Sequence, residues 1–240
     1  MAKKDYRPPP RKEPGLLSFI VSGCVSLCAW LIVSLLISIV IEWIGIKLLW
    51  QEEGAYHSQR VLMSDQVYLN HQALNKSESL KEAIVEKTVK IVNWFTNDSW
   101  LQNVIKWARS TNEESSKLAM WANRFYTKYD KYIHASITVS QIFVVRLALI
   151  VFSLPAFLLT GLVGVVDGLV ERDLRRWGGG RESSNIYNLS RKSIVPAFIS
   201  ACVIYISLPM SINPVLVILP FAVLFGLVTR ITFERLKKYF

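Results

Sequence analysis

Histidine and cysteine are the residue types best suited to metal or acid–base chemistry, but their spacing here supports neither. His57, His71 and His134 are the only histidines, and none belongs to a His-Glu-x-x-His motif or has a cysteine partner. We therefore expect each of them to be a surface or helix-flank residue. All three cysteines lie in apolar runs, where a thiol serves as a small packing group rather than as a zinc ligand or a disulfide partner. They are Cys24, Cys28 and Cys202.

Patterns for nucleophilic catalysis and phosphate binding are also missing from the sequence. The serines of the first apolar run recur at multiples of four residues, but no His, Lys or Asp lies in that run to activate one of them. Residues 178–184 read Gly-Gly-Gly-Arg-Glu-Ser-Ser, without the Lys-Ser/Thr pair of a P-loop or a buried strand before it. The sequence therefore predicts no catalytic residue, no metal and no cofactor, in a protein that is not an enzyme.

The elements that carry these residues are dominated by long apolar runs. The chain has 240 residues, of which 52% are hydrophobic and only 19% charged, with a net charge of +10. Residues 16–41, 147–166 and 193–229 contain no Asp, Glu, Lys or Arg, and such runs are typical of membrane spans. The last run is too long for one span, and Pro209 and Pro214 predict a turn within it. That turn makes either two short spans or a re-entrant hairpin.

We therefore predict an all-α, polytopic membrane protein with four transmembrane helices and a helical periplasmic insertion between the first and the second. The insertion, residues 42–146, is polar and has the 3.6-residue period of amphipathic helices. The predicted segments are a basic Pro-rich tail at 1–14, spans at 15–41, 147–166, 193–208 and 215–229, a Gly-rich loop at 167–192, a short periplasmic turn at 209–214 and a basic tail at 230–240.

The distribution of basic residues predicts the orientation. The N-terminal tail has five Lys and Arg, residues 167–192 have six, the C-terminal tail from Arg230 has four, and the turn at 209–214 has none. Because basic residues collect in short cytoplasmic segments, these counts place both termini and the Gly-rich loop in the cytoplasm. Glu42 and Asp167 then lie at span ends on opposite faces of the membrane, which makes a proton relay or a transport path through one copy a weaker alternative.

Two further features indicate contacts between helices or proteins. Trp94, Trp100, Trp107 and Trp121 are too many for the small core of the insertion, which predicts that some of them lie at a membrane interface or a partner surface. Gly164 and Gly168 form a small-xxx-small pair. This pair indicates close helix packing, either within the chain or in a homo-oligomer.

The segment around the Gly-rich loop is the motif with the most information. The apolar side chains of residues 169–177 predict a helix that continues the second span, and Gly178 to Gly180 then stop it. The arginines of this segment are suited either to anionic lipid headgroups or to a protein partner. The predicted partner-contact residues are Asp167, Glu171, Arg172, Asp173, Arg175, Arg176, Trp177, Gly178, Gly179, Gly180, Arg181, Glu182, Ser183, Ser184 and Tyr187.

Residues 167–184, followed by Tyr187 and the basic pair Arg191 and Lys192, resemble the signature of the integrating conjugative element membrane proteins, a bacterial family. The order of spans and insertion is similar as well. Where the family commonly has a histidine after the tyrosine, this chain has Asn188. The resemblance implies a membrane protein encoded with a type IV secretion-like conjugation apparatus.

Taken together, these patterns predict a non-catalytic inner-membrane component of a conjugative DNA-transfer apparatus that acts through protein contacts. Its expected partners are other inner-membrane subunits, with anionic lipid headgroups at the cytoplasmic face. We attribute the excess of basic residues to the orientation of the chain in the membrane, so we expect no direct binding of nucleic acid. The alternative is a stand-alone membrane protein, such as an exclusion or envelope factor, and a small transporter is a weaker one.

Overall fold

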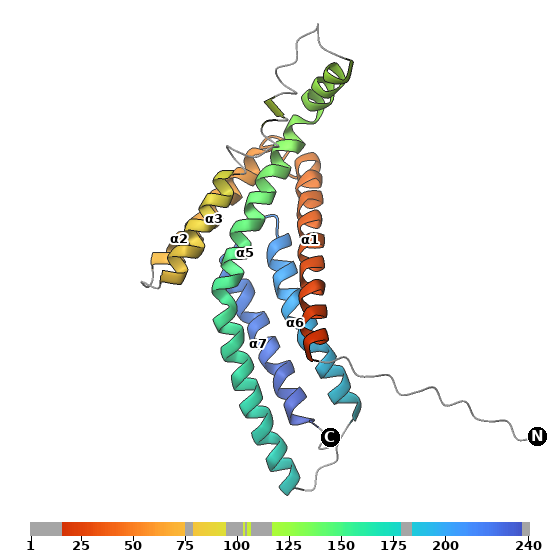
Figure 1. The fold of residues 1–240 in the computed structure, drawn as a ribbon, viewed down its shortest axis with the longest axis vertical. Helices are drawn as coiled ribbons and strands as arrows, with labels where there is room; N and C mark the ends of the chain where they lie inside the picture. The colour runs from red at the N-terminus through yellow and green to blue at the C-terminus, as the bar shows by residue number, and fades with distance from the viewer. Residues whose placement is uncertain are drawn as a thin grey trace, which may run out of the picture.

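A computed structural model describes residues 16–74, 79–94, 103, 105–106, 117–178 and 184–236. Within them the chain forms six helices and no strand, which confirms the all-helical expectation for this part of the chain. Figure 1 shows an elongated bundle in which one helix runs nearly the whole length of the molecule. The helices are α1 (Leu16–Leu48), α2 (Tyr56–Leu74), α3 (Ser79–Asn93), α5 (Lys117–Trp177), α6 (Ser184–Ser207) and α7 (Pro214–Glu234).

Helix α5 is the axis of the bundle. Its 61 residues extend about 92 Å at the α-helical rise of ~1.5 Å per residue. The boundary that charge suggests between Arg146 and Leu147 is not a helix end, because no proline or glycine interrupts the chain between Lys117 and Pro155. Helices α1, α6 and α7 lie to one side of α5, and the α2–α3 hairpin packs on the other side (Figure 1).

Four of the helices, α1, α5, α6 and α7, are long and apolar enough to cross a membrane. Helix α6 ends at Ser207 and α7 begins at Pro214, so the chain turns between the two where prolines were expected to stop a helix. The side chain of Asn213 caps α7 by accepting a hydrogen bond from the N–H of Val215 at 3.0 Å.

Among the described residues, the two larger apolar clusters join the helices. The larger cluster brings α2 and α3 against α5 and α6; its most buried members are Leu69, Val145, Leu149, Tyr205 and Ile206. The smaller cluster joins α5, α6 and α7 through the rings of Phe157, Phe198 and Phe225, which meet edge to face at centroid distances of 5.1 to 6.5 Å.

Helix α1 buries small and polar side chains and exposes large apolar ones, which is the reverse of an amphipathic helix in a soluble protein. The residues that it buries are mostly small or polar and recur every four positions, at Ser34, Ser38 and Glu42. Its large apolar side chains are exposed along most of its length. The serine spacing thus serves helix packing: Ser34 Oγ lies 3.2 Å from Ser207 Oγ and 3.4 Å from the carbonyl oxygen of Val203.

Glycines bring α5 and α7 into close contact below the turn between α6 and α7. A Cβ atom at Gly164 would lie 2.3 Å from the carbonyl oxygen of Gly226, and one at Gly168 would lie 2.5 Å from that of Arg230. The small-xxx-small pair is therefore used for packing within the chain, because only a missing side chain lets the two backbones approach this closely.

This contact predicts that Gly→Ala substitutions at two positions will differ in their effect on the stability of the fold. Gly164→Ala forces α5 and α7 apart and should lower the free energy of unfolding by about 1 to 3 kcal/mol, the usual cost of overpacking. Gly23→Ala in α1 is the matched control, since nothing lies within 4 Å of its Cβ position. It should be neutral or stabilising, because alanine favours the helix. Thermal unfolding of the purified protein in detergent micelles measures both; equal melting temperatures would contradict the packing argument.

Candidate functional site

The segment predicted to contact partners spans the end of α5 and the beginning of α6. Residues Asp167, Glu171, Arg172, Asp173, Arg175, Arg176 and Trp177 form the last turns of α5. Gly178 follows, and its N–H donates a hydrogen bond to the carbonyl oxygen of Leu174 at 3.1 Å. Ser184 and Tyr187 lie in the first turn of α6. Gly179, Gly180, Arg181, Glu182 and Ser183 lie outside the described residues.

Charged residues of α5 and α7 form an end charge cluster, defined here as Asp167, Glu171, Arg175, Arg230 and Glu234. Arg230 Nε lies 2.7 Å from Asp167 Oδ2, and its Nη2 lies 4.0 Å from Glu171 Oε2. Arg175 forms an ion pair with Glu234. The pairs of Arg230 are exposed, and such pairs contribute little stability, about 0 to 1 kcal/mol each, whereas the side chains of Arg175 and Glu234 are only 18% and 15% exposed. Every pair joins α5 to α7 and so aligns the two helix ends.

An apolar stripe beside this cluster is open to the surroundings. Val170, Leu174 and Trp177 follow one another at helical spacing on α5, and all three are exposed. Trp177 has 92% of its surface accessible. The sequence predicted an apolar helix side here, and the structure shows that no described part of the chain covers it. An exposed tryptophan next to arginines is a common feature of protein interfaces.

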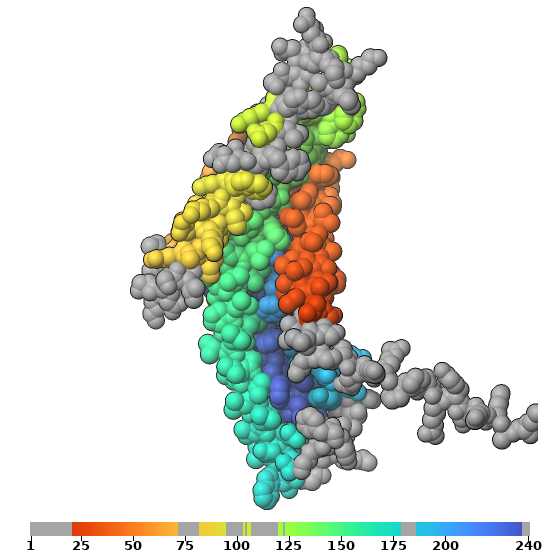
Figure 2. All heavy atoms as spheres, in the orientation of Figure 1, coloured from red at the N-terminus to blue at the C-terminus, as the bar shows by residue number. Residues whose placement is uncertain are grey.

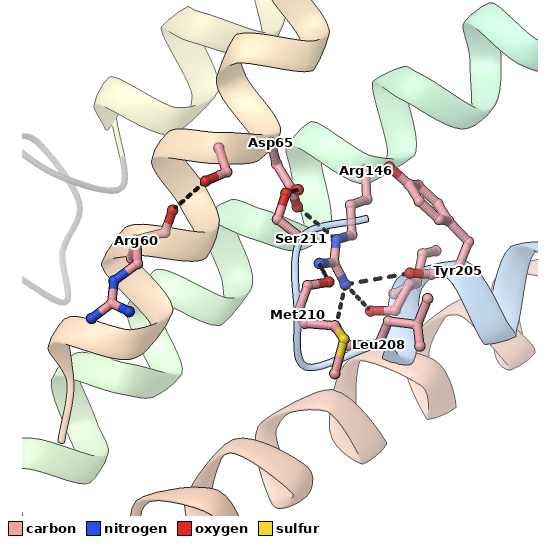
Figure 3. A network of polar contacts seen from close by, with 9 residues as sticks. Arg60, Asp65, Arg146, Tyr205, Leu208, Met210 and Ser211 are labelled. Atoms are coloured by element: carbon pink, nitrogen blue, oxygen red, sulfur yellow. Dashed lines mark hydrogen bonds and ion pairs between the residues drawn. The ribbon is translucent and has the colours of Figure 1, made fainter. Parts of the chain in front are cut away.

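A second polar site lies deep in the bundle, around Arg146 (Figure 3). Arg146 Nε donates to Asp65 Oδ2 at 2.7 Å, and both side chains are 1% exposed. Ser211 Oγ donates to the other carboxylate oxygen of Asp65. Because an unpaired charge in an apolar core is very costly, these contacts are a condition for burying either residue.

Backbone carbonyl groups complete the coordination of the guanidinium. Arg146 Nη1 donates to the carbonyl oxygens of Tyr205, at 3.3 Å, and Ile206, at 3.0 Å, and also to that of Leu208. Nη2 donates to the carbonyl oxygen of Met210 at 3.0 Å. The last carbonyls of a helix have no partner within the helix and carry partial negative charge, so a cation is stabilised there. We call Arg146, Asp65, Ser211 and these four carbonyl groups the Arg146 cage.

The Arg146 cage connects four segments with one side chain. Arg146 belongs to α5, Asp65 to α2, Tyr205 and Ile206 to the end of α6, and Leu208 to Ser211 to the turn before α7. The guanidinium is planar, and its five N–H groups can each be directed to a fixed acceptor. The Arg146 guanidinium is therefore suited to hold α2 and the turn between α6 and α7 in a fixed position against α5.

Sequence reasoning missed this site because its two charged residues are 81 positions apart. Arg146 was assigned to a boundary and Asp65 to the polar insertion. One signal was present: Asp65 shares a helix face with Val61 and Leu69, one turn away on either side, and both are buried. A carboxylate at a core position of an amphipathic helix requires a buried partner, although the pattern does not say which one.

Glu42 and His57 form another pair that the sequence did not predict. His57 Nδ1 lies 3.3 Å from Glu42 Oε1, and the imidazole stacks on the ring of Trp50 with centroids 3.9 Å apart. His57 was expected to be a surface or helix-flank residue, and it is the second residue of α2. Its side chain is only 16% exposed, since it fills the corner where the chain turns from α1 into α2. The pair fixes this corner.

Other groups with metal-binding or redox chemistry are dispersed. Among the described residues, no group of three His, Cys, Asp or Glu side chains lies close enough together to hold a metal ion. The three cysteines are free thiols; Cys24 and Cys28 are exposed on α1, and Cys202 is buried in the larger apolar cluster.

A comparison with protein families shows which family the chain belongs to. A family model described as IncC plasmid conjugative DNA transfer protein DtrJ-like matches residues 49–237. The chain belongs to the DtrJ-like family. The match covers the Arg146 cage, the end charge cluster and the α6–α7 hairpin, and it begins directly after α1. No curated protein and no solved structure matches the chain.

Membership of the DtrJ-like family confirms the association with conjugation that the loop motif suggested. The family description names a plasmid, whereas the resemblance at residues 167–187 was to proteins of integrating elements. Conjugative DNA transfer is common to both, and it is the part of the expectation that the match supports.

The Arg146 cage predicts a strong and selective stability effect in this DtrJ-like protein. Asp65→Ala leaves a buried guanidinium without its counter-charge, and should lower the free energy of unfolding by about 3 to 5 kcal/mol. Arg60→Ala is the matched control on the same helix: Arg60 pairs with Glu53 at 2.9 Å, but its side chain is 66% exposed. This control should cost at most about 1 kcal/mol.

Thermal unfolding in micelles measures both variants, and limited proteolysis adds a local readout. Because the cage holds the turn between α6 and α7, Asp65→Ala should also increase cleavage near Met210 while Arg60→Ala should not. Equal melting temperatures and equal cleavage in the two variants would show that the ion pair does not organise the bundle.

Proposed function

We propose that this chain is a multi-pass inner-membrane component of a conjugative DNA-transfer apparatus of the type IV secretion kind, and that it acts through protein contacts rather than catalysis. The observation that carries the proposal is a combination: four helices long and apolar enough to cross a membrane, in a chain of a conjugative transfer family. A protein of this kind contributes to transfer by holding other components at the membrane.

The charge pattern supports one orientation. The end charge cluster, the last turns of α5 and the first turns of α6 lie at the same end of the bundle as the N-terminus of α1 and the C-terminus of α7 (Figure 1). Arg172 and Arg176 belong to these turns of α5, and Arg191 and Lys192 to α6. Basic segments next to spans favour the cytoplasmic side. In the proposed topology both chain termini and the α5–α6 connection are cytoplasmic, and α2, α3 and the N-terminal part of α5 belong to the periplasmic side.

The exposed stripe Val170, Leu174 and Trp177 is the proposed cytoplasmic contact surface. It is apolar, lies next to the arginines of the end charge cluster and extends beyond the charges that mark the end of the apolar bundle. Aromatic and arginine side chains are the residues that most often contribute binding energy at interfaces. Anionic headgroups are the second partner for Arg172 and Arg176, which lie on the same turns.

Reporter fusions test the topology. Alkaline phosphatase, which is active in the periplasm, should be active when fused after Tyr56 and inactive when fused after Phe240. Green fluorescent protein should give the reverse pattern, because it folds into its fluorescent form in the cytoplasm. Fluorescence from the Tyr56 fusion would contradict the proposed orientation.

Mating assays test the role in transfer. Deletion of the gene should lower conjugation frequency, and the intact chain supplied in trans should restore it. Trp177→Ala should restore transfer about tenfold less well or worse, since truncating an interface tryptophan commonly removes 2 kcal/mol or more of binding energy. Its matched control is Tyr56→Ala, also a large and exposed aromatic but at the other end of the bundle. Unchanged transfer after gene deletion would reject the proposed function.

A further inference from the structure

The apolar surface of this bundle is longer than a bilayer is thick. Asp167 of the end charge cluster and Arg146 are 21 positions apart on α5, which is about 32 Å at ~1.5 Å per residue. That distance matches a hydrocarbon core of about 30 Å. With the proposed cytoplasmic position of the end charge cluster, the outer surface of the bilayer lies at the height of the Arg146 cage and of the polar turn between α6 and α7.

Helix α1 continues beyond that height. Ser34 contacts Val203 and Ser207 at the end of α6, so it lies level with the Arg146 cage. Further along α1, Trp43 Nε1 donates to Ser136 Oγ at 3.0 Å, and Ser136 is ten positions, or about 15 Å, above Arg146 on α5. The last three turns of α1 therefore extend out of the bilayer on the periplasmic side.

These last turns remain apolar and exposed. Val40, Trp43, Ile44 and Leu48 have 45% to 69% of their surfaces accessible. In Figure 2 this part of α1 forms an outer edge of the molecule beside α5. These side chains lie above the proposed bilayer surface, so lipid tails cannot cover them. A contiguous apolar surface exposed to water marks an interaction site.

An aromatic ladder on α5 extends the same surface. Trp43 meets Tyr132 at a centroid distance of 5.9 Å, and successive contacts of 4.8 to 6.4 Å then connect Tyr132 to Tyr129, Phe125 and Trp121. Tyr129, Phe125 and Trp121 are exposed. Ile105 packs on Tyr126, Ile133 and Ile137, which lie on a different face of α5. We call Val40, Trp43, Ile44, Leu48, Tyr129, Phe125 and Trp121 the outer apolar patch.

The charges beside the outer apolar patch favour a different protein over a second copy. Lys47, Arg124 and Lys128 are exposed next to it, and the ammonium of Lys128 lies 5.5 Å from the ring centre of Tyr129. Two copies in one membrane are related by an axis along the membrane normal, so a symmetric contact through this patch would bring the basic residues of both copies together at the same heights. Such a dimer would place lysine against lysine, which is unfavourable.

We propose that the outer apolar patch binds a helix of another inner-membrane subunit, one whose apolar face continues past the periplasmic surface of the bilayer and which carries carboxylates at the height of Lys47 and Lys128. This inference rests on the proposed function, because it uses the proposed orientation. It adds the position of a second contact surface, on the membrane face opposite to Trp177, and the chemistry of the partner.

Site-specific photocrosslinking in living donor cells tests the inference. Ile44→p-benzoylphenylalanine places a photoreactive group in the outer apolar patch. Leu162→p-benzoylphenylalanine is the matched control, since Leu162 is similarly exposed but lies on α5 within the proposed span. Each variant is irradiated in cells that carry the complete transfer system and in cells that express only this chain together with a second, differently tagged copy.

The expected result is an adduct at position 44 with one protein encoded by the transfer system, identified by mass spectrometry, and none at position 162. Adding Lys47→Glu and Lys128→Glu should lower the adduct yield about tenfold, because the rim charges would then repel the carboxylates of the partner. Both lysines are exposed, so the melting temperature of that variant should be unchanged.

Three results would overturn the inference. They are an adduct with the tagged second copy, no protein adduct at position 44, and an adduct whose yield does not fall when Lys47→Glu and Lys128→Glu are added. The reporter fusion after Tyr56 separates these failures from failure of the proposed function. If that fusion is periplasmic and position 44 gives no adduct, only this inference fails. If the fusion is cytoplasmic, the proposed orientation fails and the inference fails with it.

Discussion

The burial of one guanidinium is the constraint on which the rest of this bundle depends. Arg146 lies in the middle of α5 among apolar side chains, where a charge is tolerated only if every donor finds an acceptor. Asp65 supplies the counter-charge from α2, and the end of α6 with the following turn supplies the carbonyl groups. Satisfying this single side chain therefore determines where the α2–α3 hairpin lies and where α6 must stop.

The two polar layers of the molecule, the Arg146 cage and the end charge cluster, divide α5 into regions with different surroundings. Between them, α5, α6 and α7 pack through aromatic rings and glycines, and their outer faces are apolar. Beyond each layer, large apolar side chains are exposed at heights where charged groups also occur, at Trp177 on one side and at Trp43 and Trp121 on the other. This pattern is the basis for the two contact surfaces proposed above, one toward each end of α5.

The family match gives this architecture its biological setting. Residues 49–237 of the chain match a family of conjugative DNA transfer proteins, and both polar layers fall within that range. The roles assigned to the charged residues are mainly those of alignment: Arg146 orders α2 and the α6–α7 turn, and Arg175 and Arg230 align α5 with α7. These three arginines thus serve to position helices within the bundle.

The sequence by itself determined the features that depend on neighbouring residues. Charge-free runs located the apolar helices, Pro209 and Pro214 indicated the turn, and Gly178 marked the end of α5, since each acts through local backbone geometry or local polarity. Only the tertiary structure decided that Asp65 meets Arg146, that Gly164 meets Gly226, and that α1 buries its serines and exposes its large apolar side chains. These pairings join residues tens of positions apart, and they depend on the register between whole helices, which no local pattern encodes.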